Sequence, residues 1–207
     1  SAFAKSLGFA LDVPVIPVHH MEAHLLMAKY DAPQLKYPFL TLLVSGGHTI
    51  LAKVQSSGVY KILGQTIDDA VGEAFDKTAK LLGLRYPGGP EIEKNAAKGE
   101  KMKESFPRPI LKSDNYNFSF SGLKTAVLYK VNSLKEKNEF TKQTISDVSL
   151  EFQEAAIDCL LYKTKKALID FNLYQVVLSG GVAANKQLRK RFNEELGKKY
   201  AVIYPDF

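Results

Sequence analysis

Leu42-Leu43-Val44-Ser45-Gly46-Gly47 recurs in the second half of the chain as Val176-Val177-Leu178-Ser179-Gly180-Gly181. Each copy is a short apolar run, which predicts a buried strand, followed by a glycine turn that permits positive φ or close approach of another backbone. The copies lie 134 positions apart, measured from Ser45 to Ser179. Two similar strand-turn units predict an α/β fold with two similarly built lobes, which we place at residues 1–100 and 101–207.

The sequence around the two copies predicts alternating strands and helices. The segment 100–117 is rich in Lys, Pro, Ser and Asn, which indicates a loop at the boundary between the lobes. Apolar spacing and turn residues predict strands at 39–44, 49–54, 59–63, 175–178 and 201–204, and helices at 20–30, 68–82, 91–98, 122–132, 144–171 and 183–196.

The composition is that of a globular protein with a substantial core. The chain has 207 residues, of which 45% are hydrophobic. It contains no apolar run of about 18 residues, so we expect a cytoplasmic protein without a membrane span, or a protein of the mitochondrial matrix if the source is a eukaryote. Cys159 is the single cysteine and lies among apolar residues at helical spacing, which favours a buried, inert thiol over a nucleophile.

The net charge of +6 is compatible with a polyanionic partner but does not require one. Two basic clusters lie on predicted helices, and for either cluster taken alone a solvated helix face is the preferred interpretation over nucleic-acid binding. The clusters are Lys163, Lys165 and Lys166, and Lys186, Arg189, Lys190, Arg191, Lys198 and Lys199.

Histidines open the predicted helix at 20–30. His20 and His24 are four residues apart and therefore share a helix face, where two imidazoles can bind one metal ion, whereas His19 faces elsewhere. Glu22 follows His20 by two positions, so the pattern differs from the zincin His-Glu-x-x-His motif and Glu22 is expected to point away from the ion. The alternative is a structural role for the histidines at the start of the helix.

The Ser-Gly-Gly turns are candidate phosphate sites because no side chain shields their amides. The second copy runs into a predicted helix N-terminus, where a nucleotide could bind. Asp68 and Asp69 are placed to cap the helix at 68–82, whereas Asp76 lies within it beside Phe75 and needs hydrogen-bond donors, such as ribose hydroxyls. Ser121 is expected to cap the helix at 122–132, since no base lies near it in sequence.

Six motifs in this order resemble the catalytic subunit of tRNA threonylcarbamoyladenosine synthase, the TsaD or Gcp family, in its bacterial or mitochondrial form. They span nearly the whole chain. The motifs are His20-Met-Glu-Ala-His24, Leu43-Val-Ser-Gly-Gly-His-Thr49, Asp69-Ala-Val-Gly-Glu-Ala-Phe-Asp-Lys77, Tyr86-Pro-Gly-Gly-Pro90, Phe118-Ser-Phe-Ser-Gly-Leu-Lys-Thr125 and Leu178-Ser-Gly-Gly-Val-Ala-Ala-Asn185.

The resemblance implies an actin/Hsp70/sugar-kinase-like (ASKHA) fold, in which duplicated lobes enclose a nucleotide. It also implies an acyltransferase that moves the threonylcarbamoyl group from threonylcarbamoyl-AMP to the N6 amine of the adenosine beside the anticodon, in tRNAs that read codons beginning with A. His20 and His24 would bind one divalent ion, Fe(II) or Zn(II). Nucleotide contacts are implied for Leu43, Val44, Ser45, Gly46, Gly47, Asp76, Gly89, Asn185 and, where many members carry Asp, Glu93.

The family's first phosphate loop and its third metal ligand find no match in this chain. We therefore expect a fragment of a longer protein, incomplete at both ends and inactive alone. The resemblance implies tRNA as the substrate, with a TsaB-like paralogue and a TsaE-like ATPase as partners in bacteria, or a homodimer in mitochondria. Two alternatives stay open: a metallopeptidase that uses the paired histidines, and a non-catalytic module that docks partners.

Overall fold

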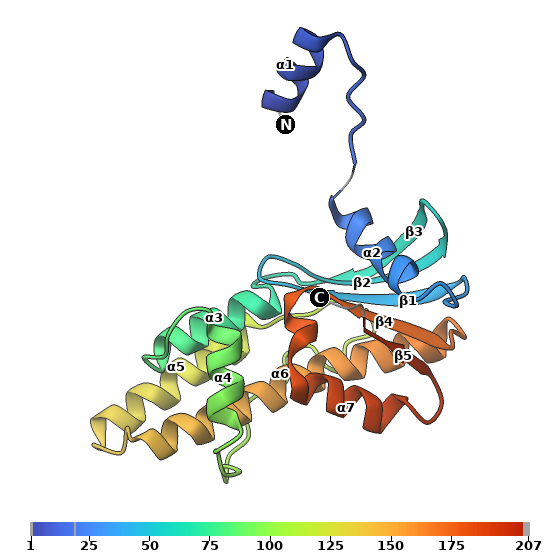
Figure 1. The fold of residues 1–207 in the computed structure, drawn as a ribbon. Coiled ribbons are helices and arrows are strands. Elements are labelled where there is room, and N and C mark those ends of the chain that lie inside the picture. The colour runs from blue at the N-terminus through green and yellow to red at the C-terminus, as the bar shows by residue number, and fades with distance from the viewer. Residues whose placement is uncertain (1, 19, 205–207) are drawn as a thin grey trace.

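The computed structural model describes residues 2–18 and 20–204 as a twisted sheet with helices on both faces (Figure 1). The helices are α1 (Ala2–Leu11), α2 (His20–Asp31), α3 (Val71–Leu81), α4 (Gly88–Ala96), α5 (Ser121–Glu136), α6 (Lys142–Asp170), the 3₁₀ helix η1 (Gly181–Ala184) and α7 (Lys186–Leu196). The strands are β1 (Phe39–Val44), β2 (Thr49–Ser56), β3 (Val59–Gln65), β4 (Gln175–Ser179) and β5 (Ala201–Ile203).

One sheet contains all five strands in the order β3-β2-β1-β4-β5. β1, β2 and β3 form an antiparallel meander, whereas β4 runs parallel to both β1 and β5. Every residue of β1 is buried, and β4 is buried from Val176 onward. This burial explains why both strands are apolar without alternation, because a strand covered on both faces has no solvent side.

The two Ser-Gly-Gly strands are therefore neighbours in one sheet, with Leu42 paired to Leu178, and they do not belong to two separate lobes. The prediction of one copy in each lobe was wrong on this point. Both copies are central strands, so the shared burial accounts for their similar apolar sequences. Since adjacent parallel strands end at the same sheet edge, both glycine turns lie at that edge.

Helices cover the two faces of the sheet unequally. The larger core lies between one face and α3 to α7, and it includes Leu42, Phe75, Phe152 and Leu178. On the other face, α2 and the segment after it pack over a smaller cluster that includes Leu43 and Val177. Within residues 2–18 and 20–204, no helix is both long and apolar enough to cross a bilayer.

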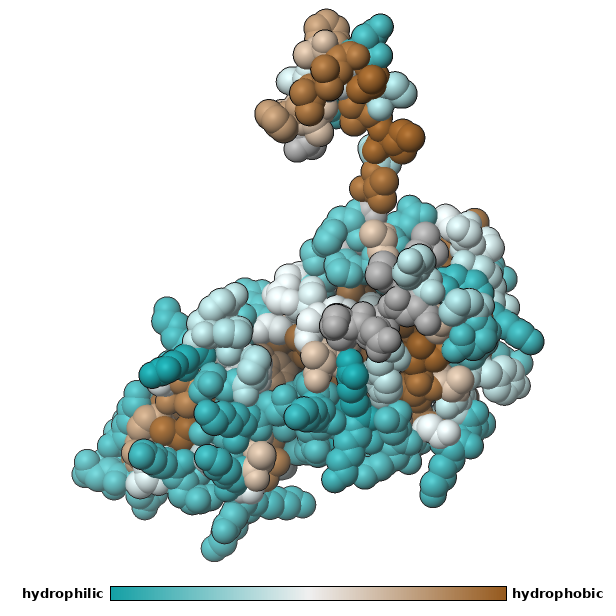
Figure 2. Space-filling view, viewed as in Figure 1, coloured by the Kyte–Doolittle hydropathy of each residue, from teal (hydrophilic) through white to brown (hydrophobic). Residues whose placement is uncertain are grey.

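The first helix, α1, stands apart from the rest of the described chain (Figure 1). Figure 2 shows that its surface is largely hydrophobic, and Phe3, Phe9 and Leu11 are among its exposed side chains. Gly8 alone in this helix is buried, against Val13 and Val15 of the segment that follows. The sequence pattern did not predict this helix.

The remaining predicted elements are present, with shifted boundaries. α3 begins at Val71 instead of residue 68, because the Val71 amide donates to the Thr49 hydroxyl and the Gly72 amide donates to the Ser45 carbonyl. The helix predicted at 183–196 is divided, since Asn185 is extended, with φ −60° and ψ 121°. It ends η1 and begins α7.

Candidate functional site

A cavity of about 320 Å³ lies at the sheet edge where β1 and β4 end. It gathers five of the residues predicted to contact a nucleotide, from the β1–β2 turn, α3, α4 and the start of α7. These residues are Gly46, Asp76, Gly89, Glu93 and Asn185. Gly46 and Asn185 are far apart in the sequence but line the same cavity, because β1 and β4 are adjacent and parallel.

Three glycines leave the cavity wall open. A Cβ atom built on Gly46, Gly89 or Gly181 would have no neighbour within 4 Å, so packing does not explain their lack of a side chain. All three line the cavity. Backbone groups at such positions can approach a ligand directly, which is the property that phosphate-binding turns require.

Other glycines at the same edge are required by close packing. A Cβ on Gly72 would lie 2.6 Å from the Ser45 carbonyl oxygen, and one on Gly88 would lie 2.6 Å from the Asp76 Cα. These contacts let α3 approach the β1–β2 turn and the start of α4. This close packing fixes the positions of the β1–β2 turn and of α4, which contain Gly46 and Gly89.

Asp76 lies on the cavity side of α3 and accepts a hydrogen bond from the Gly88 amide at 2.7 Å. This bond offsets the cost of a carboxylate beside Phe75, which the sequence had left unexplained. It also ties α3 to the Tyr86–Pro90 turn. Binding of a ribose by Asp76 stays a prediction.

The N-terminus of α7 is capped by side chains of the protein. Glu93 accepts from the Lys186 amide at 2.6 Å, and Asn185 accepts from the Leu188 amide at 2.8 Å. The Asn185 amide group donates to Gln153 at 2.9 Å. Both Glu93 and Asn185 line the cavity, and their polar atoms also join α4 and α6 to α7. Nucleotide binding at this helix end stays a prediction.

The first Ser-Gly-Gly sequence forms the hairpin turn between β1 and β2. Leu43 and Val44 are fully buried in the strand, and the Ser45 hydroxyl accepts from the His48 amide at 3.1 Å. Of the predicted run from Leu43 to Gly47, only Gly46 lines the cavity among the described residues. The first Ser-Gly-Gly sequence is therefore a β-hairpin turn, and Gly46 within it also lines the cavity.

His20 and His24 lie on one face of α2, as their spacing predicted, with ring centroids 4.6 Å apart and an interplanar angle of 76°. Burial, followed by repulsion from His20 and from His48, lowers the pKa of His24. A neutral imidazole is the form that binds metal, so this pair fits two ligands of a metal site. Among the described residues, no cluster of three His, Cys, Asp or Glu could hold an ion. His19 lies outside those residues.

Glu22 lies away from the paired histidines, at the β2–β3 turn. A Cβ built on Gly58 would lie 3.6 Å from its carboxylate oxygen. A metallopeptidase needs a base beside the metal. The position of Glu22 therefore disfavours the metallopeptidase alternative.

Asp68 caps α5 from another part of the chain. Its carboxylate accepts from the Phe120 amide at 2.8 Å, from the Ser121 hydroxyl at 2.7 Å, and from the Ser119 hydroxyl. The predicted caps were therefore wrong: α3 has Ala70 at its N-cap, and Ser121 is the first residue of α5 instead of its cap. Burial opposes the charge on Asp68, but these hydrogen bonds prevail and lower its pKa.

We expect Asp68→Ala to lower the free energy of unfolding by about 0.5–2 kcal/mol, the cost of losing a helix cap, because Asp68 is exposed and water replaces part of its hydrogen bonding. Asp68→Asn serves as the matched control for charge. Since the folded-state pKa lies below the ordinary value of 3.8, the charge stabilises the protein fully above that pH and less as the pH falls below it. Chemical denaturation at several pH values measures this. A stability difference between wild type and Asp68→Asn that grows below pH 3.8 would contradict the assignment.

Two further predictions from the sequence have clear outcomes. Cys159 is buried, as predicted, and this burial raises the pKa of its thiol to about 12, which disfavours a role as a nucleophile. Lys163 is buried, with its ammonium group donating to the Ser113 and Asn115 carbonyls, so this residue does not belong to a solvated basic face. The spacing of residues along α6 could not predict this burial, because the 100–117 segment that covers Lys163 is distant in the sequence.

Comparisons with known proteins place the whole chain in one group. The family model described as "TsaD: tRNA N6-adenosine threonylcarbamoyltransferase" matches residues 1–207. Relatives with that same name are 49% identical in Chromobacterium violaceum and in Nitrosospira multiformis, each over 99% of this chain and over 61% and 59% of the relative. The chain thus spans about 60% of the length of these relatives.

Solved structures share the fold at low sequence identity. Full-length HypF in its phosphate- and nucleotide-bound form has a TM-score of 0.68 at 17% identity, covering 96% of this chain and 41% of that one. The (R)-2-hydroxyglutaryl-CoA dehydratase component A from Acidaminococcus fermentans has a TM-score of 0.54 at 16% identity, covering 89% and 60%. These similarities establish the ASKHA-type fold.

Proposed function

Because the chain belongs to the TsaD family of tRNA N6-adenosine threonylcarbamoyltransferases, we propose that it supplies the nucleotide cavity for threonylcarbamoyl transfer to tRNA. In this reaction the N6 amine of adenosine forms a bond to the carbamoyl carbon of threonylcarbamoyl-AMP. The bond from that carbon to the phosphate oxygen breaks, AMP leaves, and the amine releases a proton to solvent. The observation that carries the proposal is the convergence of Gly46, Asp76, Gly89 and Gly181 on one cavity.

The residues of the cavity suit the adenylate part of this substrate. Open backbone at Gly46 and Gly181 would admit the phosphate, and amides near the reacting carbon would stabilise negative charge that develops on its oxygen. The carboxylate of Asp76 would accept from ribose hydroxyls while it holds the Gly88 amide. No covalent nucleophile is required, in agreement with the high pKa of Cys159.

We also propose His20 and His24 as ligands of one divalent ion, Fe(II) or Zn(II). Such an ion would supply Lewis-acid polarisation of substrate oxygens when bound. The lowered pKa of His24 and the shared helix face support this role. A third ligand would have to come from outside the described residues.

The partners and location of the protein are part of the same proposal. The substrate is tRNA, and the protein acts in the cytoplasm with a TsaB-like paralogue and a TsaE-like ATPase, or as a homodimer in the mitochondrial matrix. Size-exclusion chromatography of the complete protein with and without these candidate subunits distinguishes the two arrangements.

Gly181→Leu tests the cavity directly. Because a Cβ at this position meets no atom within 4 Å, a leucine can enter the cavity without displacing the core. We expect AMP binding to the complete protein, followed by calorimetry, to weaken at least tenfold, and threonylcarbamoyladenosine in tRNA, measured by mass spectrometry, to fall in parallel.

Exposed Lys165→Leu is the control for added hydrophobic volume, since Lys165 does not line the cavity. Unchanged AMP affinity and unchanged tRNA modification in Gly181→Leu would refute the proposal. A thermal melt of each variant establishes that the protein is folded.

A further inference from the structure

A second concave surface lies on the neighbouring side of α3, between α3 and α5. This groove has a volume of about 530 Å³, and four of the seven residues that line it are lysines, with no acidic residue among them. The lining residues are Lys77, Lys80, Leu81, Lys124, Thr125, Leu128 and Lys135. Figure 2 shows exposed hydrophobic side chains at this end of the molecule, surrounded by hydrophilic ones.

Neighbouring carboxylates neutralise only part of this charge. Asp69 bonds to Lys77 at 2.8 Å and to Lys124 at 2.7 Å, and Glu73 also bonds to Lys77. Lys80 and Lys135 are exposed and, within the described residues, have no carboxylate within ion-pair distance. The Lys135 ammonium lies 5.1 Å from the centre of the Phe140 ring, a contact that brings no negative charge to the groove. A net positive groove with an apolar floor remains.

The groove and the cavity are built on adjacent faces of one helix. Phe75 and Asp76 of α3 line the cavity, whereas Lys77, Lys80 and Leu81 line the groove. A large anion that rests in the groove would therefore lie directly beside the cavity. This arrangement suits a polymer whose one reacting group must enter the cavity while its remainder stays outside.

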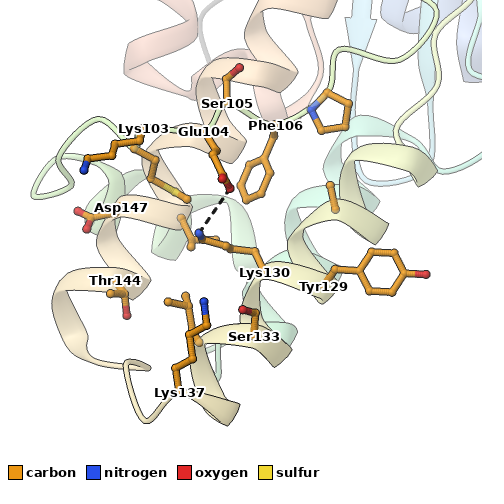
Figure 3. A pocket seen from close by; sticks show the side chains of 15 residues that line it. Lys103, Glu104, Ser105, Phe106, Tyr129, Lys130, Ser133, Lys137, Thr144 and Asp147 are labelled. Atoms are coloured by element: carbon orange, nitrogen blue, oxygen red, sulfur yellow. Dashed lines mark ion pairs between the residues drawn. The ribbon is translucent and has the colours of Figure 1, made fainter.

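An exposed aromatic side chain lies next to the groove on α5. Tyr129 follows the groove residue Leu128 and is 69% exposed. Tyr129 is also one of the residues that line the cavity of about 750 Å³ on the other side of α5, and Figure 3 shows its ring pointing outward from the helix. Exposed aromatic rings beside basic side chains are typical of surfaces on which unpaired bases stack.

Other basic surfaces of the protein fit a polyanion less well. The cavity of about 750 Å³ in Figure 3 mixes Lys103, Lys130 and Lys137 with Glu104 and Asp147, and Lys130 pairs with Glu104 at 4.0 Å. In the basic clusters noted from sequence, Lys163 is buried and Arg191 is bonded to Glu154, Asp158 and Glu195. In contrast to the cavity in Figure 3, the α3–α5 groove has no acidic residue in its lining.

We propose that the α3–α5 groove, together with Tyr129, is the docking surface for the phosphate backbone and an unstacked base of tRNA. This inference rests on the proposed function, because it takes tRNA as the polymer whose adenosine enters the cavity. Lysines in the groove neutralise phosphates, and the ring of Tyr129 holds a base.

The test uses the complete protein and an unmodified tRNA transcript, with binding followed by fluorescence anisotropy across a range of salt concentrations. The double variant Lys80→Ala/Lys135→Ala is expected to weaken binding roughly tenfold or more at low salt and to reduce the slope of log K against log salt by about 2, since two phosphate contacts are lost. The matched control is Lys165→Ala/Lys198→Ala, which removes two exposed lysines that do not line the groove.

Each outcome has a distinct meaning. Equal binding by the wild type and the groove variant overturns the docking surface but leaves the proposed function intact, whereas a wild type that does not bind tRNA at all overturns both. Equal loss in the control variant overturns the assignment to the groove, as does a groove variant that keeps tRNA but loses an acidic protein partner. Weakening of roughly tenfold in Tyr129→Ala but not in Tyr129→Phe supports stacking.

Discussion

Gly180→Ala is expected to lower the melting temperature by about 6–12 °C, which corresponds to about 3 kcal/mol for a protein of this size. Gly180 has φ +88°, which is costly for a residue with a side chain, and a Cβ would lie only 2.4 Å from the Val44 carbonyl oxygen. The Val44 backbone cannot move away from the added Cβ easily, because Val44 is fully buried in β1. Thermal unfolding followed by circular dichroism measures the change.

Gly181→Ala is the matched control for this prediction. It changes the next residue in the same way, but its Cβ meets no atom within 4 Å and its φ is not in the positive range. We expect its melting temperature to stay within about 2 °C of wild type. Similar melting temperatures for the two variants would show that the close approach of β4 to β1 does not limit stability.

Asp158→Ala is expected to cost about 2 kcal/mol, or about 4–8 °C in melting temperature. Asp158 on α6 accepts from Arg108 at 3.0 Å and from Arg191 at 2.8 Å, and so joins the 100–117 segment and α7 to the central helix. Both guanidinium groups are only about one quarter exposed or less, at 22% and 23%. Removing the carboxylate takes one of its partners from each guanidinium group, although Arg108 keeps Glu151 and Arg191 keeps Glu154 and Glu195.

Asp170→Ala on the same helix provides the comparison. Asp170 pairs with Lys166 at 2.6 Å and accepts from the Tyr116 hydroxyl at 2.7 Å, but the Asp170 and Lys166 side chains are more exposed, at 37% and 30%. Solvent screens this pair, so the loss of stability is expected to be smaller than in Asp158→Ala. Urea titrations of the two variants give the free energies of unfolding. A loss in Asp170→Ala as large as that in Asp158→Ala would contradict a special role for the shared carboxylate.

The sequence predicted local elements better than their arrangement. Strands 39–44 and 175–178 were correct because unbroken apolar runs that end in glycine leave few alternatives. Their pairing was missed, since two similar central strands resemble a duplication as closely as they resemble neighbours in one sheet. The boundary of α3 was shifted because Thr49, 22 residues before Val71, caps it.

The sequence predicted which residues belong to the candidate site, but it did not predict the hydrogen bonds that they form. Gly46, Asp76 and Gly89 were identified as neighbours through the family resemblance, and the structure brings them to one cavity. The bond from Lys186 to Glu93 joins residues 93 positions apart, a contact that no local pattern encodes. For the same reason, the sequence could not predict that the lysines of α3 and α5 line one groove, because this depends on how the two helices pack.

Helix α3 forms a wall of the cavity with one side and a wall of the groove with the next. Occupants that favour different positions of this helix are therefore thermodynamically linked. If RNA in the groove alters the affinity of the adenylate by some factor, the adenylate must alter the affinity of RNA by the same factor. Asp69 forms ion pairs with Lys77 on α3 and with Lys124 on α5, so a shift of α3 would also move the lysines of the groove.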